Sequence, residues 1–214
     1  GSLAARCTVF AHWTETNRTQ NSLNQYIGLT SGVSNPATVD DCSPSATCRS
    51  TDDNIFRQVR LSGGTARNYV DGATRGCSAE GNAAKHVPAM YYYGTYDVGG
   101  AHHSDHQYCG AEVRPLSEFR VDALPTFAVI TPNLCHDGHD CANADVDRFA
   151  RSAIAPILAS RTYAEGRTAL MVLYDEDFPV PNLLVAPTAA PGIARTKAGH
   201  AAMLRTWEEM LGLP

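Results

Sequence analysis

Two stretches of the sequence contain side chains of the types that carry out chemistry. The first, residues 133–141, reads NLCHDGHDC, so that two cysteines enclose two histidines and two aspartates. Such a loop is compatible with a zinc site, a redox motif or a disulfide that holds catalytic groups in place. The sequence contains no Cys-x-x-Cys pair, which weakens the zinc and redox interpretations. A disulfide that fixes Asp137 and His139 is the favoured interpretation, and His136 is expected to be an ordinary surface histidine.

The second stretch is acidic. Asp175, Glu176 and Asp177 follow the apolar run TALMVLY at residues 168–174. Adjacent carboxylates repel each other, and a bound divalent cation is a common way to keep both of them ionised. A solvated strand end without any ligand is an equally good interpretation of these residues taken alone.

Two weaker candidates for contacts with phosphate lie earlier in the chain. Ser22 stands at the start of a possible helix over residues 22–32, where free N–H groups and the helix dipole favour a phosphate. Lys85 and His86 precede a strand-like aromatic run at residues 87–93, and a cation beside an imidazole could cradle phosphate oxygens. Neither signal is specific by itself.

The elements that must position these residues are clearest in the C-terminal half. Short apolar runs predict strands at residues 126–131, 168–174 and 182–187, the second of them buried on both faces. Apolar residues at helical spacing predict helices at residues 145–163 and 199–211, with Met203, Leu204, Trp207, Met210 and Leu211 on one side of the second. This order predicts an α/β sheet with helices on its faces. Because chemistry in such sheets lies beyond the carboxyl ends of the strands, the loop and the acids are expected to form one site.

The middle of the chain is rich in glycine and is expected to be mostly turns. It includes the histidine-rich residues 102–106, which we expect to form a mobile surface loop in which any metal binding is adventitious. The chain shows no convincing linker. Residues 1–214 are therefore predicted to form a single domain.

Composition limits the classes of partner. The chain has 214 residues and a net charge of -5, and its basic residues are scattered, which argues against a nucleic-acid partner. A small anionic substrate remains compatible with this pattern. No apolar run approaches the roughly 18 residues that a membrane span requires.

The seven cysteines indicate a disulfide framework. Cys42 lies close in sequence to Cys48, and Cys135 to Cys141, which leaves Cys77 and Cys109 as a natural third pair. Cys7 is then expected to be a buried free thiol. Disulfides indicate an oxidising compartment, so the protein is expected to be secreted or extracytoplasmic, although the first residues are not a signal peptide.

The order of the motifs resembles that of the secreted bacterial phosphoesterases, which include acid phosphatases and phospholipase C relatives of the alkaline-phosphatase-like superfamily. The run ITPNLCHDGHDC is similar to the family's TPNLCxDxHDC, and LMVLYDED, LLVAP and HAAMLRTWEEMLGLP follow in the family's order. YIGLTSG, DDCSPS, NIFRQV and KHVPAMYYY match earlier motifs, so the resemblance covers nearly the whole chain. It implies an alkaline-phosphatase-like sheet with helices on both faces and a loop-rich middle region.

The resemblance also implies roles for individual residues. Ser22 falls at the nucleophile position within the family's HPSLPNY, and Asp175 and Glu176 occupy the acidic pair that would bind one divalent metal ion together with Ser22. The residues expected around the phosphoryl oxygens and the leaving group are Lys85, His86, Asp137, His139 and His200. Of these, His86 and His139 are expected to act as proton donors, and the other three to bind the substrate.

The implied activity is a metal-dependent phosphoric-ester hydrolysis through a phosphoserine intermediate, of the acid-phosphatase type. The alternatives are a phospholipase C-type phosphodiesterase, for which the tyrosines at residues 91–93 are the one hint, and a non-catalytic remnant that binds phosphate or metal. The substrate would be a small phosphate ester or a phospholipid headgroup. The resemblance leaves the identity of the metal open.

The chain departs from the family pattern in two places. Gln20 and Asn21 replace the His-Pro that precedes the family's nucleophile, and Asn24 replaces the second proline, which should loosen this loop. The family also begins with a central strand that ends in a metal-binding Glu-Asn pair, and SLAARC at residues 2–7 corresponds to the segment after it. We therefore expect a domain that is truncated at its N-terminus relative to the family, with an incomplete metal site and poor activity.

Overall fold

A computed structural model describes residues 5–17, 21–80, 83–176 and 182–214. Its strands are β1 (Thr8–Thr14), β2 (Ala66–Val70), β3 (Thr95–Val98), β4 (Ala101–Ser104), β5 (Val113–Pro115), β6 (Phe127–Thr131), β7 (Leu170–Val172), β8 (Asn182–Val185) and β9 (Gly192–Gly199). Its α-helices are α1 (Ser22–Ser31), α2 (Ile55–Leu61), α3 (Cys109–Glu112), α4 (Asn143–Leu158), α5 (Arg161–Ala164) and α6 (His200–Leu211). Short 3-10 helices are η2 (Pro36–Thr38), η3 (Ala84–His86), η4 (Pro88–Met90), η5 (Asp105–Tyr108) and η6 (Leu116–Glu118). Strands and helices alternate along the chain, so the predicted α/β class is confirmed.

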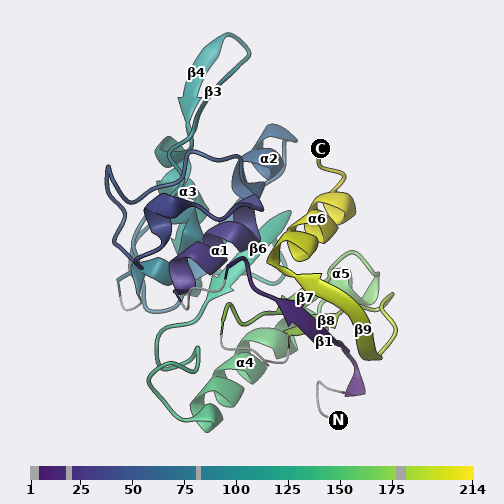
Figure 1. Cartoon of the computed structure of the whole chain (residues 1–214). Helices are drawn as coiled ribbons and strands as arrows, with labels where there is room; N and C mark the ends of the chain where they lie inside the picture. The colour runs from purple at the N-terminus through teal and green to yellow at the C-terminus, as the bar shows by residue number, and fades with distance from the viewer. Residues whose placement is uncertain (1–4, 18–20, 81–82, 177–181) are drawn as a thin grey trace.

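The strands form separate sheets, where one sheet was expected (Figure 1). A parallel three-stranded sheet has the order β5-β2-β6, and the register of β2 with β6 runs from Ala66 opposite Phe127 to Val70 opposite Thr131. A mixed four-stranded sheet has the order β7-β8-β1-β9, in which β1 is antiparallel to β8 and parallel to β9. Within the described residues, β6 and β7 are therefore edge strands of two different sheets.

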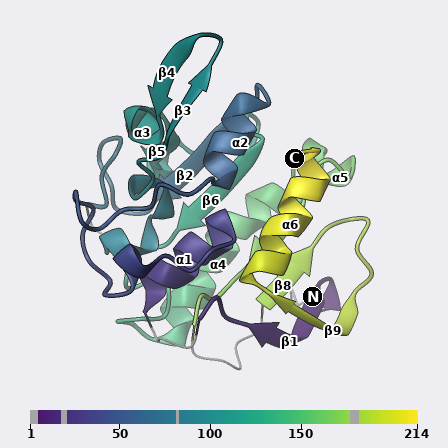
Figure 2. The same cartoon turned by 45° about the horizontal axis from the view of Figure 1, so that its top comes forward.

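Helices cover both sides of β6. Successive side chains of a strand point to opposite faces, so Phe127 and Ile130 contact different helices. Phe127 packs on Phe56 of α2 and on Trp207 of α6, with ring centroids 5.7 and 5.2 Å apart. Ile130, on the other face, lines a small apolar cavity together with Phe149 of α4. Both views show α1 and α6 side by side (Figure 2), and their buried residues join one hydrophobic core.

Helix α6 connects the two sheets. The Trp207 indole Nε1 donates to the sulfur of Met171 in β7 at 2.6 Å while its ring contacts Phe127 in β6. Met203 and Leu204 are buried on the same side, as the helical spacing predicts. Met210, which was expected on this side, is 55% exposed, whereas its neighbour Leu211 packs against the core.

Three local expectations are wrong in detail. The helix expected over residues 145–163 is two helices, because the Ser160 side chain accepts a hydrogen bond from the Tyr163 N–H and starts α5. The expected strand over residues 87–93 is instead the 3-10 helix η4, in which Pro88 occupies the first turn. Strand β7 is half-buried rather than buried on both faces, since it lies at a sheet edge.

The histidine-rich segment is also not a mobile loop. It forms β4, which pairs with β3 in a hairpin that extends from the body of the molecule (Figure 1). The turn consists of Gly99 and Gly100, which have φ angles of 59° and 78°, and a two-residue hairpin turn favours glycine because both central residues need positive φ. Because glycines occur throughout the middle of the chain, these two gave no specific signal for a hairpin.

Among the described residues, no helix is both long enough and apolar enough to cross a membrane.

Candidate active site

Ser22 is held at the first turn of α1 with its hydroxyl directed at an acid. The side chain is buried, and its Oγ atom donates a hydrogen bond to Oε1 of Glu176 at 3.1 Å. Asn21, which precedes the helix, makes no side-chain cap, so the first turn is satisfied from elsewhere in the chain. The structure thus brings together two residues that are 154 positions apart and that the sequence assigned to one site.

The acidic pair follows β7 at the expected edge. Burial raises the pKa of Asp175, and a backbone hydrogen bond, the charges of His86 and Lys85 and a hydrogen bond from Ser22 oppose this. The charges of Lys85 and His86 therefore lie close enough to the Asp175 carboxylate to lower its pKa. The Oδ2 atom of Asp175 is buried and has no hydrogen-bond partner among the described residues. Asp177, the third acid, lies outside the described residues.

The loop after β6 contributes a carboxylate, Asp137, that faces an imidazole from η3, His86. Nδ1 of the buried His86 lies 3.3 Å from Oδ2 of Asp137. Burial raises the pKa of Asp137, but a hydrogen bond from His86 and one from the backbone N–H of His139 outweigh burial and leave this pKa below its ordinary value. The ring of His139 is exposed, with its centroid 6.4 Å from that of His86. Asp137 therefore lies at ion-pair distance from His86, and the exposed His139 lies beside this pair.

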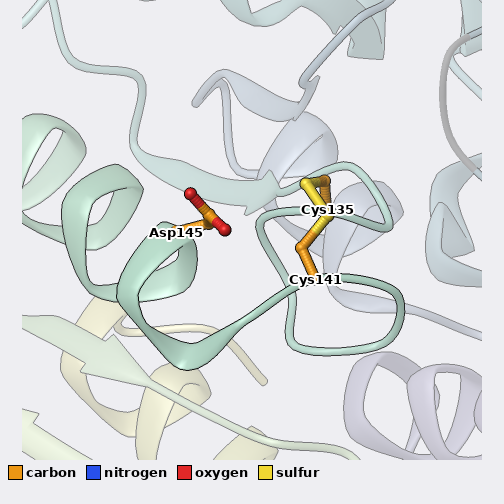
Figure 3. A group of neighbouring side chains, drawn as sticks. All are labelled: Cys135, Cys141 and Asp145. Carbon is orange, nitrogen blue, oxygen red and sulfur yellow. A yellow bond between two sulfur atoms is a disulfide. The ribbon is translucent and has the colours of Figure 1, made fainter.

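The cysteine pairs that the sequence predicted all lie at disulfide distance: Cys42 with Cys48, Cys77 with Cys109, and Cys135 with Cys141. Cys7 is a buried free thiol. Figure 3 shows Asp145 near the Cys135–Cys141 pair, a group whose ligand atoms lie within 4.8 Å of one another. Zinc requires thiolates, and these two sulfurs are bonded to each other, so this group does not fit a metal site. The disulfide instead closes the loop that carries Asp137.

His136 also has a defined role in this loop. Its Nδ1 atom lies 2.6 Å from Oδ2 of Asp71, and its ring stacks on Phe149 with centroids 4.7 Å apart. Asp71 follows β2, so this contact ties the loop after β6 to the end of the neighbouring parallel strand. The expectation that His136 is an ordinary surface histidine is therefore incomplete.

Two residues near the site were not found from the sequence. Tyr26 lies one turn after Ser22 on α1, and its ring centroid is 5.6 Å from that of His86. Burial raises the pKa of Tyr26 well above its ordinary value, and the charges of Asp175, Asp137 and Glu176 raise it further. The four-residue spacing from Ser22 was the available signal. The second missed residue, Asp41, contacts both α1 and Lys85, and its signal was its place in the DDCSPS motif.

His200 lies at the start of α6, where its described contacts are with Thr16 and Trp13 rather than with Ser22. Its Nδ1 atom accepts the backbone N–H of Thr16 at 3.2 Å and lies 2.9 Å from the hydroxyl of that residue, and its ring meets Trp13 edge-on. Burial lowers the pKa of His200 to about 4, although a hydrogen bond with the backbone of Tyr174 opposes this. Tyr174 directly precedes Asp175 in the chain, so His200 acts near the acidic pair without a described contact to it.

The donor set around Ser22 fits a hard divalent cation. Asp175, Glu176 and Ser22 supply oxygen atoms, and oxygen ligands suit magnesium, calcium or manganese. The buried Oδ2 of Asp175 is available for a ligand, and a cation would offset the cost of burying this carboxylate.

Four kinds of group therefore lie close together near the ends of β6 and β7: the serine of α1, the acidic pair after β7, and the lysine and histidine of η3. A search among curated proteins finds no match to this chain. A model of the Phosphoesterase family matches residues 1–214, the whole chain. The chain therefore belongs to the Phosphoesterase family.

Proposed function

We propose that this chain is a metal-dependent hydrolase of phosphoric monoesters that uses Ser22 as its nucleophile. Membership in the family supports phosphoric-ester hydrolysis in general. The observation that carries the specific proposal is the hydrogen bond from Ser22 Oγ to Glu176, at a helix N-terminus that would attract a phosphate.

In the first step, the Ser22 oxygen forms a bond to phosphorus while the bond to the leaving alcohol breaks. Glu176 accepts the hydroxyl proton, to which it is already hydrogen-bonded. His86, oriented by Asp137, or the more exposed His139 gives a proton to the leaving oxygen. A water oxygen then bonds to phosphorus and gives a proton to the same histidine, while Glu176 returns its proton to the Ser22 oxygen as the serine–phosphorus bond breaks and inorganic phosphate leaves.

Asp175, Glu176 and Ser22 would hold the cation, which lowers the pKa of a bound hydroxyl and neutralises phosphate charge. Lys85 stabilises the non-bridging oxygens by its charge. Asp137 follows β6 and the acidic pair follows β7, although these strands belong to two separate sheets.

The structure gives less support to a phospholipase C-type activity. Two of the three tyrosines that suggested an aromatic entrance are buried, since Tyr91 and Tyr92 are 0% and 2% exposed, and Tyr93 is half-buried. A small phosphate monoester is therefore the proposed substrate. The three cysteine pairs at disulfide distance support a secreted or extracytoplasmic location as part of this proposal.

The test is hydrolysis of a chromogenic aryl phosphate by the purified protein, with and without chelator. We expect turnover that chelator abolishes and that divalent metal restores. Ser22→Ala should remove turnover, whereas Ser152→Ala, a substitution on the exposed face of α4, should leave it unchanged. Turnover that persists in Ser22→Ala would contradict the assigned nucleophile, and chelator-resistant turnover would contradict the metal.

A further inference from the structure

Asp41 adopts a conformation that side chains other than glycine rarely take. Its φ angle is 52°, in the left-handed region, where a non-glycine residue is strained unless the surrounding structure holds it. Both oxygens of its carboxylate are engaged. Oδ1 accepts the backbone N–H of Leu23 at 2.9 Å, and Oδ2 lies 3.0 Å from Nζ of Lys85.

The segment after Asp41 is fixed to the core. The hydroxyl of Tyr91, a fully buried side chain, donates to the backbone carbonyl of Cys42 at 2.7 Å. Cys42 also pairs with Cys48 at disulfide distance. Because these contacts hold the backbone next to Asp41, the strained conformation can persist and direct the carboxylate to two partners at once.

Each partner is adjacent to a residue of the proposed site. Leu23 follows Ser22 in the first turn of α1, and Lys85 precedes His86. Asn21 provides no side-chain cap for α1, so Asp41 supplies an acceptor for a first-turn N–H from 18 residues away. The positive charge of Lys85 acts in turn on Asp175.

We propose that Asp41 is a positioning residue that holds the nucleophile helix and the phosphate-binding Lys85 in one fixed relation. This inference rests on the proposed function, because it assigns Asp41 an effect on the reaction through Lys85. An uncapped α1 or a displaced Lys85 would misalign the serine with the phosphoryl group, and small displacements at a reacting centre cost rate steeply.

The test is a double-mutant cycle between Asp41→Asn and Lys85→Met, read as kcat and KM for an aryl phosphate. Asparagine tolerates positive φ and keeps an acceptor for the Leu23 N–H, so this variant removes chiefly the charge that holds Lys85. We expect Asp41→Asn to lower kcat by roughly tenfold with little change in KM, and to have almost no further effect in the Lys85→Met background. Ser160→Ala, which removes the cap of the remote helix α5, should leave both constants unchanged.

Equal losses from Asp41→Asn in the presence and absence of Lys85 would overturn the inference, because the two residues would then act independently. A protein without wild-type turnover would contradict the proposed function separately. The linkage itself is then decided by hydrogen exchange of the Leu23 amide. Asp41→Ala should accelerate this exchange and Asp41→Asn should not, and identical exchange in all three proteins would refute the contact.

Discussion

Glu112 offers a test of how burial and charge balance in this fold. Its carboxylate is buried at the end of α3 and pairs with the Arg60 guanidinium, which also donates to Asp105 at 2.7 Å. Burial raises the pKa of Glu112 from 4.5 to about 7, and the charge and hydrogen bond of Arg60 only partly oppose this. Burial therefore outweighs the ion pair at this position.

The sign of the pH effect follows from this shift. An acid whose pKa is higher in the folded state binds its proton more tightly there, so protonation of Glu112 favours folding. The contribution is complete below about pH 4.5 and is lost as the pH rises to about 7. At about 1.4 kcal/mol per pH unit, the loss amounts to about 3 kcal/mol of unfolding free energy.

The assay is urea unfolding of the wild type and of Glu112→Gln at several pH values between about 4 and 8, with the disulfides intact. We expect the stability of the wild type relative to Glu112→Gln to fall by about 3 kcal/mol over this range. Glu118→Gln is the matched control, because a hydrogen bond from Arg114 lowers the pKa of the exposed Glu118 and gives an effect of opposite sign. A pH-independent difference for Glu112→Gln, or a rise with pH, would show that Arg60 outweighs burial.

Two further predictions concern stability. Removing the Cys77–Cys109 disulfide by a double substitution to alanine should cost about 4 kcal/mol, and removing Cys135–Cys141 about 2 kcal/mol, because the first closes a loop of 32 residues and the second a loop of 6. Denaturant midpoints measure both, and equal losses would contradict the loop-entropy argument. His200 should stay neutral down to about pH 4, because burial lowers its pKa. The unfolded state binds a proton at this residue more readily, so the free energy of unfolding should fall as the pH falls from about 6.5 towards 4. A proton NMR titration of the His200 ring with a midpoint near pH 6.5 would contradict the described burial.

The sequence indicated which of the expected site residues lie near one another, but not how the strands divide into sheets. Ser22, Lys85, His86, Asp137, Asp175 and Glu176 were assigned to one site, and the structure brings them together at the ends of β6 and β7. The rule on strand ends joined only the loop with Asp137 to the acidic pair, and the resemblance to the family supplied Ser22, Lys85 and His86. Strand positions β6 and β8 followed from short apolar runs, whose composition is a direct consequence of burial.

The remaining features depend on contacts that local patterns do not encode. Asp41 reaches Leu23 and Lys85 through a strained backbone, and nothing in its neighbours indicates that conformation. The break between α4 and α5 depends on one hydroxyl, that of Ser160, within an otherwise continuous helical pattern. The division of the strands into separate sheets reflects tertiary pairing, which hydrophobic periodicity cannot specify.

Trp207 contacts both sheets, so its fluorescence should depend on how the two sheets are placed relative to each other. Its indole ring rests on Phe127 of one sheet, and its N–H group meets the Met171 sulfur of the other. A shift of β6 relative to β7 must change the environment of this one chromophore. The second tryptophan, Trp13, lies against His200, so the two indoles sense different parts of the core. The fluorescence emission of Trp207, which takes no part in the proposed chemistry, should therefore report the relative placement of β6 and β7.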